Sequence, residues 1–197
     1  MSSQDAQVCR GAVQTAHDWM RRTLRPGDIA IDATVGNGYD AVFLASRVGD
    51  NGHVYGFDVQ EEAISQTVRR LKNERLKHRV TIFETGHENL AKLVPKEAHG
   101  RIAGVMFNLG YLPGGENKAI VTNSGSTVLA LNAALKLLTI GGVIAVVAYT
   151  GHDGGEEAFA VRSWAMSLDQ EKYAVVHYSH LNQKNAPPQL FAIERLG

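Results

Sequence analysis

The sequence is short of several features, and each shortage excludes a class of protein. Its 197 residues include one cysteine, Cys9, so no disulfide can form within the chain. Twenty basic residues match twenty acidic ones, and the formal net charge of zero lacks the strong positive field of a basic nucleic-acid-binding domain. No apolar run approaches the roughly 18 residues that a membrane span needs. The equal numbers of basic and acidic residues still allow a local basic patch on the surface.

The N-terminal segment MSSQDAQVCRG has no apolar stretch of the kind found in secretory signal peptides. Together with the scarcity of cysteine, this predicts a soluble protein in the reducing cytoplasm, without membrane contact. Cys9 is expected to be a buried small residue of a leading helix. Eight histidines are present, but no pair has metal-ligand spacing with a carboxylate, so no metal site is predicted.

Hydrophobic residues make up 44% of the chain, and residues 1–197 are predicted to form a single domain. Strand-like and helix-like patterns alternate, which indicates an α/β fold with a parallel sheet and helices on both faces. Helical spacing predicts helices at about 8–24, 39–48, 61–74, 89–93, 127–138 and 156–168. Short apolar runs predict strands at 28–33, 53–58, 80–84, 102–107, 143–149, 173–180 and 189–195.

The last two predicted strands are joined only by LNQKNAPP, which is too short for a crossover helix. They are therefore expected to pair as an antiparallel hairpin. A seven-stranded, mostly parallel sheet with a C-terminal antiparallel hairpin resembles the Rossmann-like fold of class I S-adenosylmethionine-dependent methyltransferases. A dinucleotide-binding enzyme would usually continue with a sixth parallel strand.

The segment IDATVGNGYDA, residues 31–41, carries Gly36, Gly38 and Ala41 in the pattern G-x-G-x-x-G/A, between a predicted strand and a predicted helix. The glycines let the backbone approach a ligand, and the helix start favours electron-rich groups. Asp58 ends the next strand, where a carboxylate can accept hydrogen bonds from both ribose hydroxyls. These features predict an adenosine cofactor, but they do not separate NAD from S-adenosylmethionine.

Asp32 favours S-adenosylmethionine over a dinucleotide. A carboxylate four residues before Gly36 would repel a pyrophosphate, but it can lie beside an ammonium or sulfonium group. His87, after the third strand, is expected to line the adenine side; the alternatives are that both side chains only cap local structure. The predicted cofactor-binding residues are Asp32, Thr34, Gly36, Asn37, Gly38, Asp40, Asp58, Gln60, Gly86, His87 and Asn108.

The fourth predicted strand runs into FNLGYLPGG, residues 107–115. Asn108 to Tyr111 resemble the (Asp/Asn)-Pro-Pro-Tyr motif of methyltransferases that act on amino groups, with Leu109 and Gly110 replacing the prolines. An amine must point its lone pair at the methyl carbon while acceptors hold its N–H groups. Asn108 is suited to accept such a hydrogen bond, and Tyr111 to stack on a planar substrate. An ordinary polar loop is the alternative.

Five motifs follow one another along the chain: DATVGNGYD, GFDVQ, FNLGYLPGG, YTGHDGGEE and NQKNAPP. In this order and spacing they resemble a bacterial-type family first labelled as rRNA methylases and now understood as tRNA wobble-uridine methyltransferases. The resemblance spans about residues 12–194. It implies conversion of 5-aminomethyl(2-thio)uridine to its 5-methylaminomethyl form, with S-adenosylmethionine as cofactor and the tRNA anticodon region as partner.

The resemblance also implies residue roles. Tyr149 or His152 would accept the proton that the substrate ammonium must lose. Cofactor contacts are implied at Asn37, Asp58, Gln60 and His87, and a substrate side at Asn108, Tyr111, Tyr149, Gly151 and His152. The chain departs from the family pattern, which commonly has His, Thr, Ser and Asp, at Tyr39, Ala41, Gly86 and Glu116. Tyr39 and Gly86 lie at the expected cofactor rim, so these departures affect the implied cofactor contacts, whereas the transfer loop is nearly intact and the implied reaction class is not affected.

Other interpretations stay open at this point. Basic runs at residues 21–25 and 69–79 are either solvated faces or contacts for an anticodon stem. NQKNAPP is a rigid hairpin tip, an RNA contact or a homodimer contact. The remaining function classes are an rRNA or small-molecule methyltransferase on the same fold, a NAD-dependent oxidoreductase, and a non-catalytic nucleotide-binding module.

Overall fold

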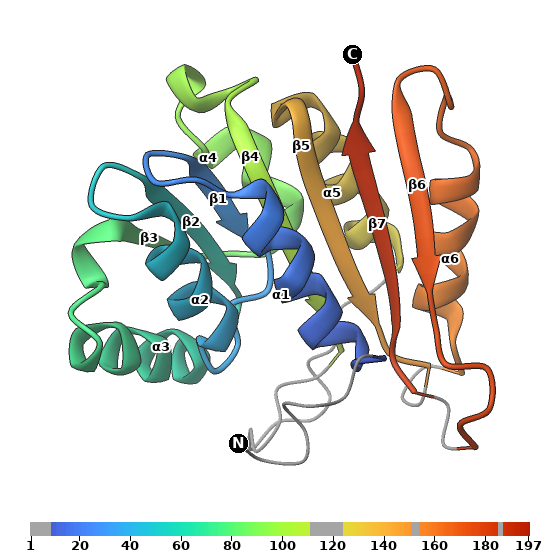
Figure 1. Cartoon of the computed structure of the whole chain (residues 1–197). Coiled ribbons are helices and arrows are strands. Elements are labelled where there is room, and N and C mark those ends of the chain that lie inside the picture. Colours follow the sequence, from blue (N-terminus) through green and yellow to red (C-terminus); the bar gives the residue numbers. More distant parts are fainter. Residues whose placement is uncertain (1–8, 111–123, 151–153, 185–186) are drawn as a thin grey trace.

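One sheet runs through the centre of the molecule, with helices in front of it and behind it (Figure 1). The structure is a computed structural model that describes residues 9–110, 124–150, 154–184 and 187–197. Within these ranges the sheet has seven strands in the order β3-β2-β1-β4-β5-β7-β6. The strands are β1 (Ile29–Asp32), β2 (His53–Asp58), β3 (Val80–Glu84), β4 (Ile102–Leu109), β5 (Leu138–Ala148), β6 (Tyr173–Tyr178) and β7 (Gln189–Arg195).

The helices form two layers. Helices α1, α2 and α3 cover one face of the sheet, and α5 and α6 cover the other (Figure 1). The α-helices are α1 (Ala12–Thr23), α2 (Tyr39–Val48), α3 (Glu61–Asn73), α4 (Leu90–Leu93), α5 (Ser124–Leu137) and α6 (Glu156–Met166). Three short 3₁₀ turns complete the described elements: η1 (Lys77–Arg79), η2 (His87–Asn89) and η3 (Lys96–Ala98).

The direction of the strands confirms the predicted fold. Strands β1 to β5 pair in parallel, whereas β7 is antiparallel to both β5 and β6. Successive side chains of a strand point to opposite faces, so in β4 Met106 joins the cluster under α1 while Phe107 joins the cluster under α5 and α6. The central strands are thus buried on both faces, as their continuous apolar runs indicated.

Helix α1 packs across the middle of the sheet, against β4, β5 and β7. Its buried residues Ala12, Ala16 and Met20 recur every fourth position, which is the spacing of one helical face. The predicted start near residue 8 was wrong, because the helix begins at Ala12. Cys9 precedes it and is exposed, so the expectation of a buried helical cysteine was also wrong.

The boundary between α5 and β5 differs from the prediction as well. The helix begins at Ser124, earlier than predicted, and β5 follows directly at Leu138 instead of at residue 143. The glycine pair Gly141-Gly142 does not end the helix; it lies in a bulge, where the pairing with β4 shifts register and Gly141 has a φ of 75°. No helix among the described residues is long and apolar enough to cross a membrane.

Candidate active site

The carboxyl ends of β1, β2, β3 and β4 lie along one edge of the sheet, and the strand order reverses between β1 and β4. In open α/β sheets ligands bind at this position, because the loops that leave neighbouring strands there run to opposite faces and open a crevice. Residues from three predicted segments meet here through hydrogen bonds: the loop after β1, the end of β2 and the end of β4.

Asp58 ties the glycine loop to the end of β2. Its Oδ2 accepts a hydrogen bond from the Gly36 backbone N–H at 2.8 Å, and its Oδ1 accepts one from the Gln60 N–H at 2.9 Å. A carboxylate has about four acceptor positions, so each oxygen has one left for a further donor. Asp58 therefore shapes the loop and can still accept a hydrogen bond from a ligand hydroxyl.

The glycine loop is pressed closely against α3. Gly36 and Gly38 have φ values of 50° and 80°, in the left-handed region that favours glycine. A Cβ atom on Gly38 would lie 2.5 Å from Oγ1 of Thr67 and 3.0 Å from its Cα, so no larger residue fits. The Thr67 hydroxyl in turn donates a hydrogen bond to the Gly36 carbonyl at 2.9 Å.

A second residue of α3 holds the next part of the loop. Arg70 Nε donates a hydrogen bond to the Asn37 carbonyl at 2.9 Å, and its guanidinium carbon lies 3.9 Å from the centroid of the Tyr39 ring. Such a cation–π contact explains how an exposed tyrosine is accommodated at the start of α2. The sequence did not predict either contact: Thr67 carried no signal on its helix, and Arg70 was interpreted only as part of the basic run at 69–79.

Asp32 lies fully buried under the loop. Its Oδ1 accepts a hydrogen bond from the Thr34 N–H at 3.2 Å, and among the described residues its Oδ2 has no hydrogen-bond partner. Burial raises the pKa of this carboxyl well above its usual value, and the negative charges of Asp40 and then Asp58 raise it further, against the opposing Thr34 hydrogen bond. Three acids thus lie close enough beneath one loop for the charges of two of them to oppose ionisation of the third.

Replacing Asp32 with asparagine should change how stability depends on pH. The raised pKa means that the folded protein holds a proton that the unfolded chain releases. Wild-type stability is therefore lost as pH rises above the unfolded pKa of about 4 and through the folded pKa. Asp32→Asn lacks this loss, so it should be the more stable protein at pH 8, by on the order of 1–3 kcal/mol, and the difference should shrink toward pH 5. Urea unfolding at the two pH values measures this.

Asp169→Asn is the matched control for that prediction. The Asp169 carboxylate is exposed, and its pKa is lowered by hydrogen bonds from the Glu171 N–H and the Lys172 ammonium. The contribution of Asp169 to stability therefore depends on pH with the opposite sign to that of Asp32, and replacing Asp169 should not stabilise the protein as pH rises. An equal pH response in both variants would contradict the account of Asp32.

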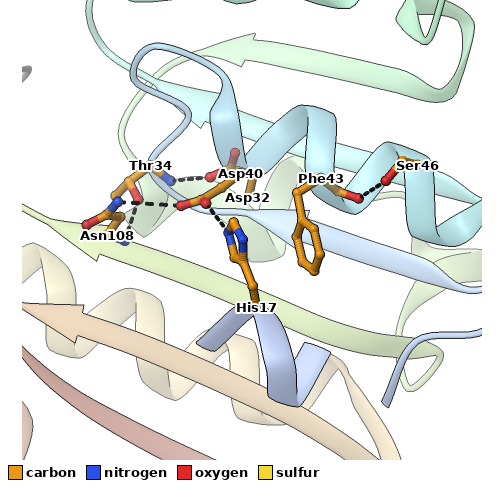
Figure 2. A network of polar contacts seen from close by, with 7 residues as sticks. All are labelled: His17, Asp32, Thr34, Asp40, Phe43, Ser46 and Asn108. Atoms are coloured by element: carbon orange, nitrogen blue, oxygen red, sulfur yellow. Dashed lines mark hydrogen bonds and ion pairs between the residues drawn. The ribbon is translucent and has the colours of Figure 1, made fainter. Parts of the chain in front are cut away.

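Asp40 connects α1 to the end of β4 (Figure 2). Its Oδ1 lies 2.6 Å from His17 Nε2, and its Oδ2 accepts a long hydrogen bond of 3.5 Å from Asn108 Nδ2. The Asn108 backbone N–H donates to Thr34 Oγ1 at 2.7 Å. The predicted residues Thr34, Asp40 and Asn108 are thus brought together, and His17 joins them without having been predicted.

His87 lies in the turn after β3 and is only 6% exposed. Burial lowers its pKa, against the raising effect of Glu88, the Ala33 backbone and more distant acids. The Nε2 atom lies 3.5 Å from Thr127 Oγ1, and that hydroxyl donates to Glu157 Oε1 at 2.6 Å. The buried His87 is thereby linked to α5 and α6. Thr127 was not identified from the sequence, and Glu157 ends the motif YTGHDGGEE but was assigned no role.

The predicted acceptor side is described in part. Tyr149 follows β5, and its Cδ2 would lie 3.5 Å from a Cβ on Gly110, so the ring borders the segment after β4. Tyr149 is 36% exposed, which leaves part of the ring accessible. Tyr111, Gly151 and His152 lie outside the described residues.

These residues fit a cationic adenosine cofactor better than a dinucleotide. Asp58 has acceptor positions left for a ribose. Asp32 Oδ2, which has no hydrogen-bond partner within the described part of the chain, would be stabilised by a positive group nearby. Asp40 adds a further carboxylate, whose charge raises the Asp32 pKa. A pyrophosphate gains no such stabilisation beside Asp32, because it would bring further negative charge to a carboxyl whose pKa Asp40 and Asp58 already raise.

Two family models, each described as a methylase or a methyltransferase, match parts of this chain. The family model described as “Putative rRNA methylase” matches residues 54–194, and that for protein-L-isoaspartate(D-aspartate) O-methyltransferase matches residues 5–99. The chain is 37% identical over 193 residues to the chloroplastic tRNA (mnm(5)s(2)U34)-methyltransferase of Arabidopsis thaliana, covering 93% of this chain and 69% of that protein.

Two solved structures match over nearly their full length. A “putative rRNA-methylase” from Clostridium thermocellum superposes with a TM-score of 0.92 at 41% identity, covering 96% of this chain and 100% of the other. A “putative methyltransferase” from Streptococcus mutans, in complex with SAH, has a TM-score of 0.84 at 37% identity, covering 95% and 99%. The match therefore includes both helical layers and the closing hairpin.

Proposed function

Because this chain belongs to the family described as “Putative rRNA methylase”, we propose that it methylates the amino group of 5-aminomethyl(2-thio)uridine at the tRNA wobble position. The chain is an S-adenosylmethionine-dependent methyltransferase, as its family, its sheet order and its SAH-bound relative agree. The Arabidopsis relative, whose name specifies the mnm(5)s(2)U34 nucleotide of tRNA, supports the substrate.

The observation that carries the choice of an amine acceptor is the position of Asn108. It lies one residue before the end of β4, its backbone is bonded to Thr34 of the cofactor loop, and its side-chain amide lies beside Asp40. An amide oxygen at this point can hold an amine N–H next to the transferred methyl group. The group at this position does not have to be an acid or a base, because a neutral amine needs only to be aligned with the methyl group.

The loop after β1 and the end of β2 form the proposed cofactor site. When bound, S-adenosylmethionine supplies a methyl group carried on a positively charged sulfur. Asp58 would accept hydrogen bonds from its ribose. A positive charge beside Asp32 would favour the ionised form of this carboxyl, against the burial and the neighbouring acids that raise its pKa. The full set of proposed cofactor residues is Asp32, Thr34, Gly36, Asn37, Gly38, Asp40, Asp58, Gln60, Gly86, His87 and Asn108.

The acceptor amine must arrive neutral, because an alkyl ammonium has a pKa of about 10 and no free lone pair. Exclusion of water and a neighbouring positive charge both lower that pKa. We assign Asn108 to hold the amine and Tyr149, at the end of β5, to border it. Tyr111 is proposed to stack on the uracil ring, and His152 or Tyr149 to accept the proton.

The proposal includes the tRNA anticodon region as partner and the cytoplasm as location. Part of the basic run at 69–79 is held by contacts within the protein. Arg70 holds the Asn37 carbonyl, and Arg79 pairs with Asp50 and the Ala45 carbonyl. The hairpin tip is proposed as an RNA contact or a homodimer contact.

Transfer of a labelled methyl group separates the proposal from its alternatives. Labelled S-adenosylmethionine should modify tRNA from cells that lack the terminal methyl group and should leave ribosomal RNA from the same cells unlabelled. Label in ribosomal RNA alone would favour the family description over the substrate proposed here. Label in neither RNA, with the cofactor bound, would favour a small-molecule acceptor.

A further inference from the structure

The leading helix places a histidine in the active site that the proposed function leaves without a role. His17 Nε2 lies 2.6 Å from Asp40 Oδ1, and its ring stacks on Phe43 with centroids 4.0 Å apart and planes 6° apart (Figure 2). The two side chains of the pair are 18% and 8% exposed. The stacking and the short hydrogen bond fix the imidazole, so it in turn fixes the carboxylate.

Asp40 decides which way the Asn108 amide faces. A carboxylate only accepts hydrogen bonds, so the group that it meets at 3.5 Å must be the amide NH₂. The amide oxygen is then directed away from Asp40. The Asn108 backbone is held by its hydrogen bond to Thr34, so the contact with Asp40 acts on a side chain that starts from a fixed point of the strand.

We propose that His17 and Asp40 are positioning residues, which hold the Asn108 amide with its oxygen toward the acceptor amine. The reason is chemical: if the amide rotated by half a turn, it would present N–H donors to the N–H groups of the amine and repel them. The substrate side of this inference rests on the proposed function. The orientation of the amide rests only on the contacts of His17, Asp40 and Asn108.

Replacing His17 tests the first link. His17→Leu should lower kcat about tenfold at saturating cofactor, the effect of one hydrogen bond to a charged group, and leave the cofactor Kd within about twofold. His17→Gln keeps a donor near the position of Nε2 and should recover most of the rate. His53→Leu is the control: it removes a half-buried histidine bonded to Thr81 at the opposite end of β2 and should keep the wild-type kcat.

Exchanging the charged partner tests the second link. Asp40→Ala frees the amide and should lower kcat about tenfold, whereas Asn108→Asp puts two carboxylates side by side and should also be slow. The double variant Asp40→Ala/Asn108→Asp removes that repulsion and presents an oxygen to the amine in either rotation. It should therefore be faster than each single variant, and an additive loss would overturn the proposal.

A readout without substrate keeps this inference separate from the proposed function. The Asn108 side-chain NH₂ pair in ¹⁵N-labelled protein is identified by its loss in Asn108→Asp. Its exchange with solvent should be slow in the wild type and His17→Gln, and about tenfold faster in His17→Leu and Asp40→Ala. Unchanged exchange in both variants would overturn the inference. Faster exchange in both, in a protein that transfers no methyl group to tRNA, would support it and refute only the proposed substrate.

Discussion

Replacing Asp58 with alanine is expected to lower the affinity for S-adenosylmethionine by roughly 10²- to 10⁴-fold. Two hydrogen bonds from ribose hydroxyls to a carboxylate contribute about 1.5–3 kcal/mol each, and each 1.4 kcal/mol corresponds to about tenfold in Kd. The variant also leaves the N–H groups of Gly36 and Gln60 without their acceptor, which loosens the loop. Calorimetric titration with S-adenosylmethionine and with SAH measures the loss directly.

Glu62→Ala provides the matched control for Asp58. Glu62 lies in the first turn of α3, is exposed, and accepts a hydrogen bond from Gln66 on the same helix. Its removal should leave the Kd unchanged, although it deletes a carboxylate near the same loop. An Asp58→Ala protein that binds the cofactor within about threefold of the wild type would contradict the assignment of the ribose site.

The second large effect is expected at Asn108, on the rate and not on cofactor affinity. Asn108→Ala should reduce kcat by about a hundredfold or more, because a misplaced acceptor loses the alignment on which the transfer depends. Its removal takes away one side-chain acceptor at the end of β4, whereas the backbone bond to Thr34 remains. Single-turnover transfer with cofactor and tRNA at saturation measures the step.

Asn132→Ala is the control for that experiment, because Asn132 is an exposed asparagine on α5 that accepts a hydrogen bond from the Trp164 indole. It should transfer at the wild-type rate. Asn108 was also predicted to contact the cofactor. If its replacement raised the Kd as much as it lowered kcat/KM, with kcat unchanged, the residue would be a cofactor contact and not the amine acceptor.

The sheet could be predicted because its signals are local. Each strand is a short apolar run. The segment LNQKNAPP between the last two strands is too short for a crossover helix, so the length of this connection predicted their antiparallel pairing. The predicted ends of helices and strands were less accurate where a glycine is compatible with two kinds of local structure. Gly141-Gly142 is compatible with a helix end and with a strand bulge, and only the register against β4 distinguishes them.

The predicted site followed from the rule that ligands bind beyond the carboxyl ends of parallel strands. That rule identified Asp32, Asp58 and Asn108, which directly end their strands or lie next to the end. It could not identify His17 or Thr67. Each lies on a helix and reaches its hydrogen-bond partner, Asp40 or the Gly36 carbonyl, only once the helix has packed on the sheet. A histidine on an amphipathic helix carries no local signal of its partner.

The burial of Asp32 also could not be predicted from the sequence. The carboxylate was expected to lie beside a cation, but its exposure depends on how α2, the loop and β4 close over it. Because this carboxyl has no exposed surface and a raised pKa, its ionisation is expected to lower the stability of the protein as pH rises. In the proposed cofactor site this carboxyl therefore has a cost in stability, and urea unfolding of Asp32→Asn measures that cost.

The central claim is tested most directly by mass spectrometry of tRNA nucleosides. tRNA that lacks the terminal methyl group is incubated with the protein and S-adenosylmethionine, digested and analysed. The account predicts that 5-aminomethyl(2-thio)uridine disappears and its 5-methylaminomethyl form appears in equal amount, and that neither change occurs with Asp58→Ala at the same cofactor concentration. A protein that binds S-adenosylmethionine but leaves the 5-aminomethyl nucleoside unchanged would contradict it.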